Sequence, residues 1–233
     1  MSILIPTPIL DTPHKISRRS LLKIGLTAGI LSYGMTNHST GNARPNTLWT
    51  PRQTEGPFYP IHEQADKDID LTRIEGKTEQ AKGEVIQVQG RVLDTDGNTL
   101  SNSFVEIWQA NTWGRYAHRR DPNTAPLDPH FQGWGQTNTN SDGRYGFKTI
   151  LPGAYPAGPD WTRPPHIHFK VAKQGFHALT TQMYFPDQKL NDADLILQNL
   201  PAAQRDMVIA KRQSNDKDDA PVFSFDIVLL KIS

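Results

Sequence analysis

The 233-residue sequence predicts an all-β fold, namely an antiparallel β-sandwich with long aromatic loops and one short helix. Two observations carry this prediction. Short runs rich in valine, isoleucine and aromatic residues recur from about residue 84 onward, and turns rich in glycine, proline and aspartate separate them. The length suits one domain with a substantial core, plus extensions.

The N-terminal residues 1–43 have the features of a twin-arginine export signal. Arg18 and Arg19 are followed by two leucines and Lys23, and then by a short apolar run at 24–35. The alternative, an amphipathic basic helix, fits this order of residues less well. Small residues at 41–43 place the expected cleavage before Arg44. We therefore expect a periplasmic or secreted protein, with an N-terminal arm at 44–82 and a sandwich domain at 83–233.

Composition excludes several classes of protein. The formal net charge of +1 argues against nucleic-acid binding. No run reaches the roughly 18 apolar residues of a membrane span, so no stable membrane anchor is expected after cleavage. The sequence contains no cysteine, which excludes disulfides and thiolate ligands despite the predicted export.

The elements follow from local patterns. Within the arm, TEGPFYP at 54–60 is a rigid turn that either tethers the arm to the core or forms one wall of a pocket. A valine-rich run from residue 84 ends at Asp94-Thr95-Asp96-Gly97, which is a hairpin signal. The other expected strands are 104–108, 144–150, 166–172, 179–185 and 222–231, and a helix is expected at 201–212.

A long polar segment, 111–139, separates the second and third expected strands. Segments of this length inside a compact domain are functional or disordered. This one contains Trp113, Tyr116, Phe131 and Trp134, which is too aromatic a composition for disorder. We expect a packed loop over a site.

The stretch from Ala154 to Phe169, AYPAGPDWTRPPHIHF, contains the strongest chemical signal. In an extended strand His166 and His168 point to one face, whereas Ile167 points to the other. Neutral imidazoles are the commonest metal ligands in proteins. The residues alone leave the remaining ligands open. The candidates are the phenols of Tyr116 and Tyr155 and the side chains of His118, His130, Glu106 and Asp160.

Several motifs together resemble the intradiol ring-cleavage dioxygenases. The signature Val88-x-Gly90-x-Val92, Gly97-x-x-Leu100, Val105-Glu106-Ile107 and Gly114-x-Tyr116 resembles that of the family. WQANTWGRY, APLDPHF, NSDGRYGFKTI, GAYP, RPPHIHF and TQMYF occur in the order found in protocatechuate 3,4-dioxygenase β-type chains. The resemblance covers about residues 50–230.

The resemblance implies a site and a reaction. A non-haem Fe(III) ion would be held by Tyr116, Tyr155, His166 and His168. Tyr155 would leave when a catechol binds, and Arg163 and Gln182 would act near the metal. The substrate pocket is expected to include Pro57, Tyr59 and Trp108. Substrates would be a catechol-type molecule and O2, the product a muconate-type diacid, and the assembly a homo-oligomer or a complex with an α-like partner chain.

Two departures leave the substrate open among protocatechuate, catechol and hydroxyquinol. Ala157 stands where protocatechuate enzymes carry a tryptophan. The TEGPFYP arm is closer to the catechol and hydroxyquinol branch, but the long N-terminal helical region of that branch is absent. The rival interpretation is an exported β-sandwich module that binds metal or carbohydrate without catalysis. The pair Tyr116 and Tyr155 favours the enzyme, because a binding module has no need of both.

Overall fold

The computed structural model describes residues 49–61, 66–214 and 220–232, which lie in the compact unit Ala43–Ser233. The predicted twin-arginine segment and its cleavage site fall outside these residues. Within the described part of the chain, no helix is long and apolar enough to cross a bilayer.

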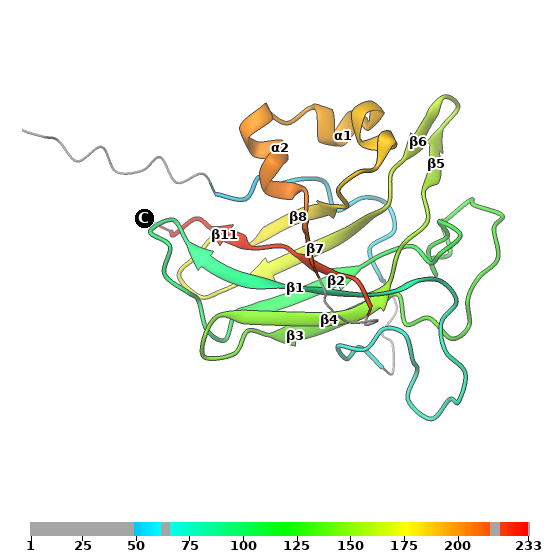
Figure 1. Cartoon of the computed structure of the whole chain (residues 1–233), viewed down its shortest axis with the longest axis horizontal. Coiled ribbons are helices and arrows are strands. Elements are labelled where there is room, and N and C mark those ends of the chain that lie inside the picture. The colour runs from blue at the N-terminus through cyan, green and yellow to red at the C-terminus, as the bar shows by residue number, and fades with distance from the viewer. Residues whose placement is uncertain (1–48, 62–65, 215–219, 233) are drawn as a thin grey trace, which may run out of the picture. The chain divides into compact units, whose positions relative to one another are not determined.

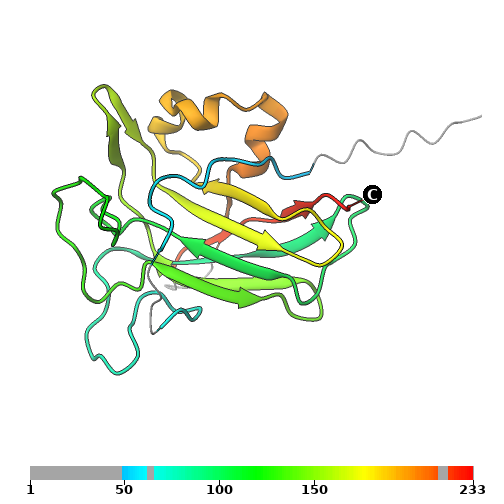
Figure 2. The same ribbon diagram turned by 180° about the vertical axis from the view of Figure 1, so that it is seen from behind.

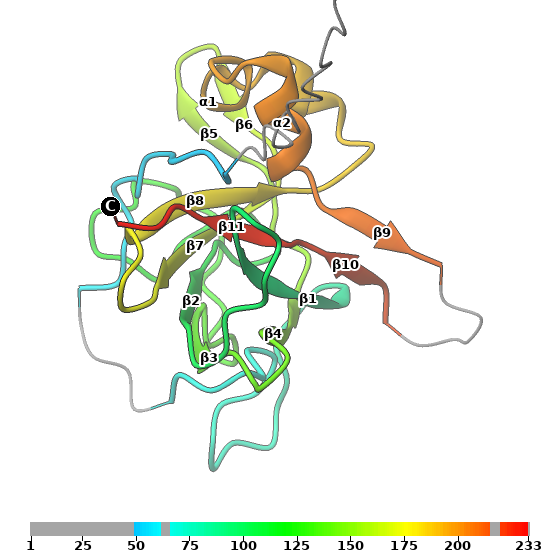
Figure 3. The ribbon, with the colours of Figure 1, turned by 90° about the vertical axis from the view of Figure 1, so that its left-hand side faces the viewer.

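Two β-sheets form the body of the protein, which confirms the predicted all-β class (Figures 1 and 3). One sheet consists of β1 (Val85–Asp94), β4 (Arg144–Ile150), β9 (Lys211–Gln213), β10 (Val222–Ser224) and β11 (Ile227–Leu229). Its strand order is β11-β1-β10-β9, and β4 also pairs with β1. The other has the order β3-β2-β7-β8; its strands are β2 (Phe104–Trp108), β3 (Trp134–Asn138), β7 (His166–Ala172) and β8 (Leu179–Tyr184).

One apolar core lies between the sheets and follows from strand alternation. In β1, Ile86 and Val88 are fully buried, whereas the intervening Gln87 is exposed. In β2, Val105 and Ile107 point into the same core, and Ile167 joins them from β7. Apolar residues from both inner faces interdigitate, as in other sandwiches. The opposite face of the second sheet is therefore left to polar and aromatic side chains.

The prediction of one strand at 222–231 is wrong in detail, because this segment forms two short strands, β10 and β11. Both run parallel to β1, so this sheet is mixed and not purely antiparallel. The break comes at Phe225, whose carbonyl oxygen would lie 1.9 Å from a Cβ placed on Gly90. Asp226 then accepts a hydrogen bond from the backbone N–H of Arg91 at 2.9 Å. The two short strands thus follow β1 on either side of this close approach.

The expected loop 111–139 is also wrong at its end, where β3 pairs antiparallel with β2. A Cβ on Gly135 would lie 2.6 Å from the carbonyl oxygen of Asp68, so glycine allows a close approach of two backbones there. The expected helix 201–212 is shorter, since α2 spans Ala202–Val208. A 3₁₀ helix, η1 (Lys189–Ala193), and a short helix, α1 (Leu195–Gln198), precede it.

The arm and a small hairpin bring further residues to one end of the second sheet. Gln53 donates its backbone N–H to the Thr180 carbonyl at 2.9 Å, so the start of the arm is a tether along β8. The hairpin of β5 (Tyr155–Gly158) and β6 (Trp161–Arg163) projects beyond the sheets on the side of α1 and α2 (Figures 1 and 2).

Candidate active site

Strand pairing sets the two histidines beside specific neighbours. In the β7–β8 register, His166 lies opposite Tyr184 and His168 lies opposite Gln182. On the other side of β7, Trp108 of β2 lies opposite His168, and its ring stacks on the imidazole at 4.8 Å with an interplanar angle of 7°. Both histidines are buried, while the side chain between them joins the core.

Tyr116 reaches the histidines from the long loop. Its hydroxyl lies 3.1 Å from Nε2 of His168 and 3.5 Å from Nε2 of His166. The backbone N–H of Tyr116 donates to Asp121 at 2.7 Å, which fixes the loop. Gly114 has φ +77°, and a Cβ there would lie 2.2 Å from the carbonyl oxygen of Ala154. Only glycine therefore lets this loop approach the turn that precedes Tyr155.

Tyr155 completes the group of four predicted ligands. Its ring packs edge-on against Tyr116, with 5.6 Å between centroids and an interplanar angle of 89°. The same distance separates it from the ring of His166. The structure therefore brings together Tyr116, Tyr155, His166 and His168, which come from a loop, a hairpin and a sheet.

Hydrogen bonding and burial keep the imidazoles neutral, which is the form in which imidazole binds a metal ion. Nδ1 of His166 lies 2.7 Å from the Pro164 carbonyl, so the ring proton is assigned to Nδ1. The Nε2 lone pair then faces Nη1 of Arg163 at 3.1 Å and the Tyr116 hydroxyl at 3.5 Å. Burial, followed by the charge of Arg163, lowers the pKa of His166 well below its usual range. The same two causes lower the pKa of His168 to about 3. Both rings are consequently uncharged near neutral pH.

Burial has the opposite effect on the phenols. It raises the pKa of Tyr116 well above its usual value, and it also raises the pKa of Tyr155. A bound cation favours the phenolate form strongly, so binding of a metal would release these protons. Two imidazole nitrogens and two potential phenolates fit a hard trivalent ion such as Fe(III), as the tyrosine ligand of some haem iron illustrates.

The other candidate ligands do not join this group. No set of three or more His, Asp or Glu side chains in the described ranges could hold a metal. Glu106 is occupied elsewhere, since it accepts from Trp134 Nε1 at 2.7 Å and from Tyr59 at 3.1 Å. His118 packs against Phe58, and Asp160 is exposed in the turn between β5 and β6.

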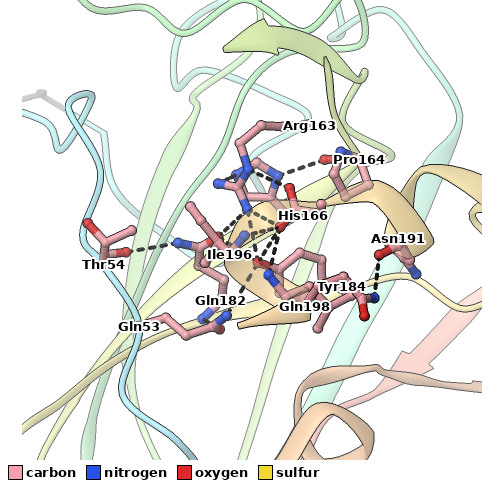
Figure 4. A network of polar contacts seen from close by, with 12 residues as sticks. Gln53, Thr54, Arg163, Pro164, His166, Gln182, Tyr184, Asn191, Ile196 and Gln198 are labelled. Atoms are coloured by element: carbon pink, nitrogen blue, oxygen red, sulfur yellow. Dashed lines mark hydrogen bonds and ion pairs between the residues drawn. The ribbon is translucent and has the colours of Figure 1, made fainter. Parts of the chain in front are cut away.

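Arg163 lies opposite Tyr155 in the β5–β6 hairpin and forms the centre of a polar network (Figure 4). Its Nη1 is 3.1 Å from His166 Nε2, and its Nη2 donates to Gln182 Oε1 at 2.8 Å. Gln182 in turn donates to the Thr54 carbonyl at 2.9 Å. Burial alone would lower the pKa of Arg163, but the hydrogen bond with Asp194 and the electrostatic interactions with Tyr184, Tyr155 and Asp194 together outweigh burial and raise the pKa above its usual value.

Sequence reasoning missed two members of this network. Tyr184 accepts from Arg163 at 2.9 Å, and strand alternation two residues after Gln182 is a signal that would have indicated it. Asp194 forms an ion pair with Arg163 at 2.9 Å. Its only local signal is that of a helix N-cap before an apolar run, which says nothing of Arg163.

An apolar cavity of about 600 Å³ adjoins the site. Its walls come from the arm, the long loop, the β5–β6 hairpin and α1: Thr54, Gly56, Pro57, Phe58, Asp121, Pro122, Tyr155, Pro156, Ala157, Gly158, Trp161, Arg163 and Ile196. The arm is therefore a pocket wall as well as a tether. The structure places Tyr59 and Trp108 elsewhere, because Trp108 lies behind His168 and Tyr59 packs edge-on against Trp108 at 5.0 Å.

A β-sandwich with two imidazoles, two phenols and an arginine converging beside an apolar cavity has the design of an enzyme that acts on a small apolar molecule. Residues 54–231 match the family model described as Dioxygenase. The chain belongs to the intradiol ring-cleavage dioxygenase family and is an enzyme of that class.

Known relatives support this membership. The chain is 44% identical over 183 residues to the protocatechuate 3,4-dioxygenase beta chain of Burkholderia cepacia, which covers 76% of this chain and 78% of that protein. Catechol 1,2-dioxygenase 2 of Acinetobacter lwoffii is 32% identical over 147 residues, or 58% of this chain and 50% of the relative. The solved dioxygenase domain of a carbohydrate-binding fusion protein from Streptomyces sp. SirexAA-E superposes with a TM-score of 0.59 at 28% identity, over 79% of this chain and all of that one.

Proposed function

We propose that this protein cleaves catechol-type rings between their two hydroxyl groups with a non-haem Fe(III) ion held by Tyr116, Tyr155, His166 and His168. The observation that carries the proposal is the convergence of the Tyr116 hydroxyl on both Nε2 atoms, at 3.1 and 3.5 Å, next to an apolar cavity. When bound, a ferric ion would withdraw electron density from the substrate and make the ring reactive toward O2.

The two tyrosines have different parts in this proposal. Tyr155 lines the cavity, so an entering substrate meets its phenol. Tyr116 is buried against the two imidazoles and is not among the lining residues. Tyr155 is therefore the phenolate that accepts a proton from a substrate hydroxyl and moves aside, which is general-base catalysis. Tyr116 stays in place throughout.

Arg163 and Gln182 act on the charge of the reacting ring. Arg163 is a buried cation in the cavity wall, where a fixed positive charge stabilises negative charge that develops on the substrate. Gln182 accepts from Nη2 of Arg163 and donates to the backbone at Thr54, so it holds the guanidinium toward the site.

The substrate class is protocatechuate, catechol or hydroxyquinol, and the product is a muconate-type diacid. The beta chain, the catechol enzyme and a hydroxyquinol 1,2-dioxygenase among the relatives support this range, and the apolar cavity suits an aromatic ring. The test is direct. Purified protein loaded with ferric iron should be coloured by tyrosinate-to-iron charge transfer, and should convert at least one of the three substrates with uptake of one O2. A colourless, iron-replete protein would refute the site.

Two further proposals concern location and assembly. The arginine pair at Arg18 and Arg19 supports export of the folded protein by the twin-arginine route to the periplasm or the medium. The likeness to a beta chain supports action with further chains, either copies of itself or an α-like partner. The test is to measure the mass in solution and the activity of the purified chain alone. An active homo-oligomer supports assembly from copies of this chain, whereas an inactive purified chain supports the need for an α-like partner.

A further inference from the structure

Asp194 is a fully buried carboxylate between η1 and α1, and both of its oxygens accept hydrogen bonds. Oδ1 accepts from the backbone N–H groups of Ile196 at 3.1 Å and Leu197 at 2.8 Å, and at longer distance from Nη2 of Arg163 at 3.3 Å and the Tyr184 hydroxyl at 3.4 Å. Oδ2 accepts from Nε of Arg163 at 2.9 Å. The side chain of Arg163 is itself only 4% exposed. Two buried opposite charges of this kind depend on each other, because either one alone is left without solvation.

The guanidinium of Arg163 has two edges with different surroundings (Figure 4). The Nε–Nη2 edge faces Asp194, and Nη2 also donates to Gln182 and Tyr184. Nη1 points to the other side, where it lies 3.1 Å from His166 Nε2. A guanidinium is planar and rigid, so holding one edge fixes the direction of the other. Asp194 thus determines where Nη1 points, although it is not among the residues that line the cavity.

The remaining contacts do not replace this anchor. Gln182 and Tyr184 are neutral and both accept from Nη2, which leaves Nε to Asp194 in the part of the chain that the structure describes. Trp161 and Tyr184 contact the guanidinium with their rings at 5.7 and 5.9 Å, and such contacts tolerate rotation in the plane. Without the carboxylate, the positive charge beside the two imidazoles would also lack its counter-charge.

We propose that Asp194 is a positioning residue for the reaction: its carboxylate holds the Nε–Nη2 edge of Arg163 and thereby aims Nη1 at the histidine pair and the adjacent cavity. The catalytic consequence rests on the proposed function, in which Arg163 stabilises charge on the substrate ring. The placement of the guanidinium does not depend on that function and is tested separately.

Asp194→Asn separates the ion pair from the helix cap. Asparagine keeps an oxygen for the N–H groups of Ile196 and Leu197 and for the longer contact with Nη2 of Arg163, but it removes the negative charge and presents an amino group to Nε. With iron-loaded enzyme we expect kcat to fall about 10–100-fold, with unchanged iron per chain and a KM that moves far less than kcat. The matched control is Asp226→Asn, which breaks the exposed Arg91–Asp226 pair of 2.8 Å in the other sheet and should leave kcat at the wild-type value.

A second measurement uses the metal-free protein. A buried, ion-paired Nε–H of Arg163 exchanges slowly with water and gives a ¹H–¹⁵N resonance near neutral pH, which Arg163→Lys assigns by removing it. We expect Asp194→Asn to lose this resonance and Asp226→Asn to keep it. Asp194→Ser, which retains a cap acceptor without a carboxylate, should behave like the asparagine variant.

The outcomes are separable. If folded Asp194→Asn or Asp194→Ser keeps kcat within about twofold of wild type, or keeps the Arg163 resonance, the positioning role is wrong. If neither variant folds, the wild-type spectrum still decides, because the absence of a protected Arg163 Nε–H would overturn the proposal. If wild type cleaves no catechol, the proposed function fails, while the resonance continues to test the anchor.

Discussion

Tyr155→Phe is the sharpest test of the two roles given to the phenols. The change removes one hydroxyl and keeps the ring, which packs on Tyr116 and His166 at 5.6 Å each. The folded protein should therefore lose no more than about 1 kcal/mol of stability. Tyr116, His166 and His168 remain, so most of the iron should stay bound and the protein should stay coloured, with a shifted absorption band.

The rate is where the variant should differ. A positioned base contributes roughly 10²–10⁴-fold, which corresponds to roughly 3–5 kcal/mol of activation free energy. Because Tyr155 lines the cavity and is the proposed base, we expect a loss of that size in single-turnover assays with catechol and protocatechuate.

Tyr116→Phe is the matched control, because it also removes one buried phenol but from the position that contacts both imidazoles. It should lose iron and colour, as elemental analysis and a visible spectrum would record. The reasoning fails if Tyr155→Phe turns over a substrate at the wild-type rate, or if Tyr116→Phe keeps as much iron as Tyr155→Phe does.

Three further predictions test the metal, the loop and the location. His168→Ala should weaken iron binding by more than the roughly 10–100-fold that is typical when a residue hydrogen-bonded to a metal ligand is changed. Near-full iron occupancy by elemental analysis would contradict the place of His168 among the ligands. Gly114→Ala should lower the unfolding free energy by at least about 2 kcal/mol in thermal melts, because φ is +77° and the new Cβ meets a carbonyl at 2.2 Å. Gly97→Ala is its control, since at φ +86° nothing lies within 4 Å and only the backbone strain of about 1 kcal/mol applies. Arg18→Lys with Arg19→Lys should keep the protein in the cytoplasm, and its continued presence in the periplasmic fraction would exclude the twin-arginine route.

The parts of the site that sequence predicts best are those set by local geometry. Alternation along an extended chain is enough to place His166 and His168 on one face, and Ile167 does lie in the core while both Nε2 atoms approach one hydroxyl. The same rule would have added Tyr184, two residues beyond Gln182. The all-β class follows equally from local runs and turns, because several strands, including 104–108, 144–150 and 166–172, show their pattern locally.

What sequence does not reveal depends on contacts between distant segments. Trp134–Asn138 is mostly polar and becomes a strand because β2 offers it an edge. The parallel direction of β10 and β11 is a property of how the chain returns to β1, and no local pattern encodes it. Asp194 lies 31 residues from Arg163, and only the fold joins the two charges. The predicted pocket positions of Tyr59 and Trp108 depend on distant contacts in the same way. Both residues are aromatic and near the site, but Tyr59 faces Glu106 and Trp108 faces His168.

Most polar side chains of the site come from strand pairs, whereas Tyr116 comes from a loop. Tyr155 pairs with Arg163 across one hairpin, and the histidines pair with their partners across another, so backbone hydrogen bonds of the sheets hold these groups. Tyr116 is held instead by the carboxylate of Asp121 and by the glycine turn at Gly114. Changes at Asp121 therefore act on Tyr116 first, whereas the histidines keep the support of their strands. In the proposed function the permanent phenolate of Tyr116 is what suits the donor set to a ferric ion, so the preference for that ion would depend on the loop more than on the sheet.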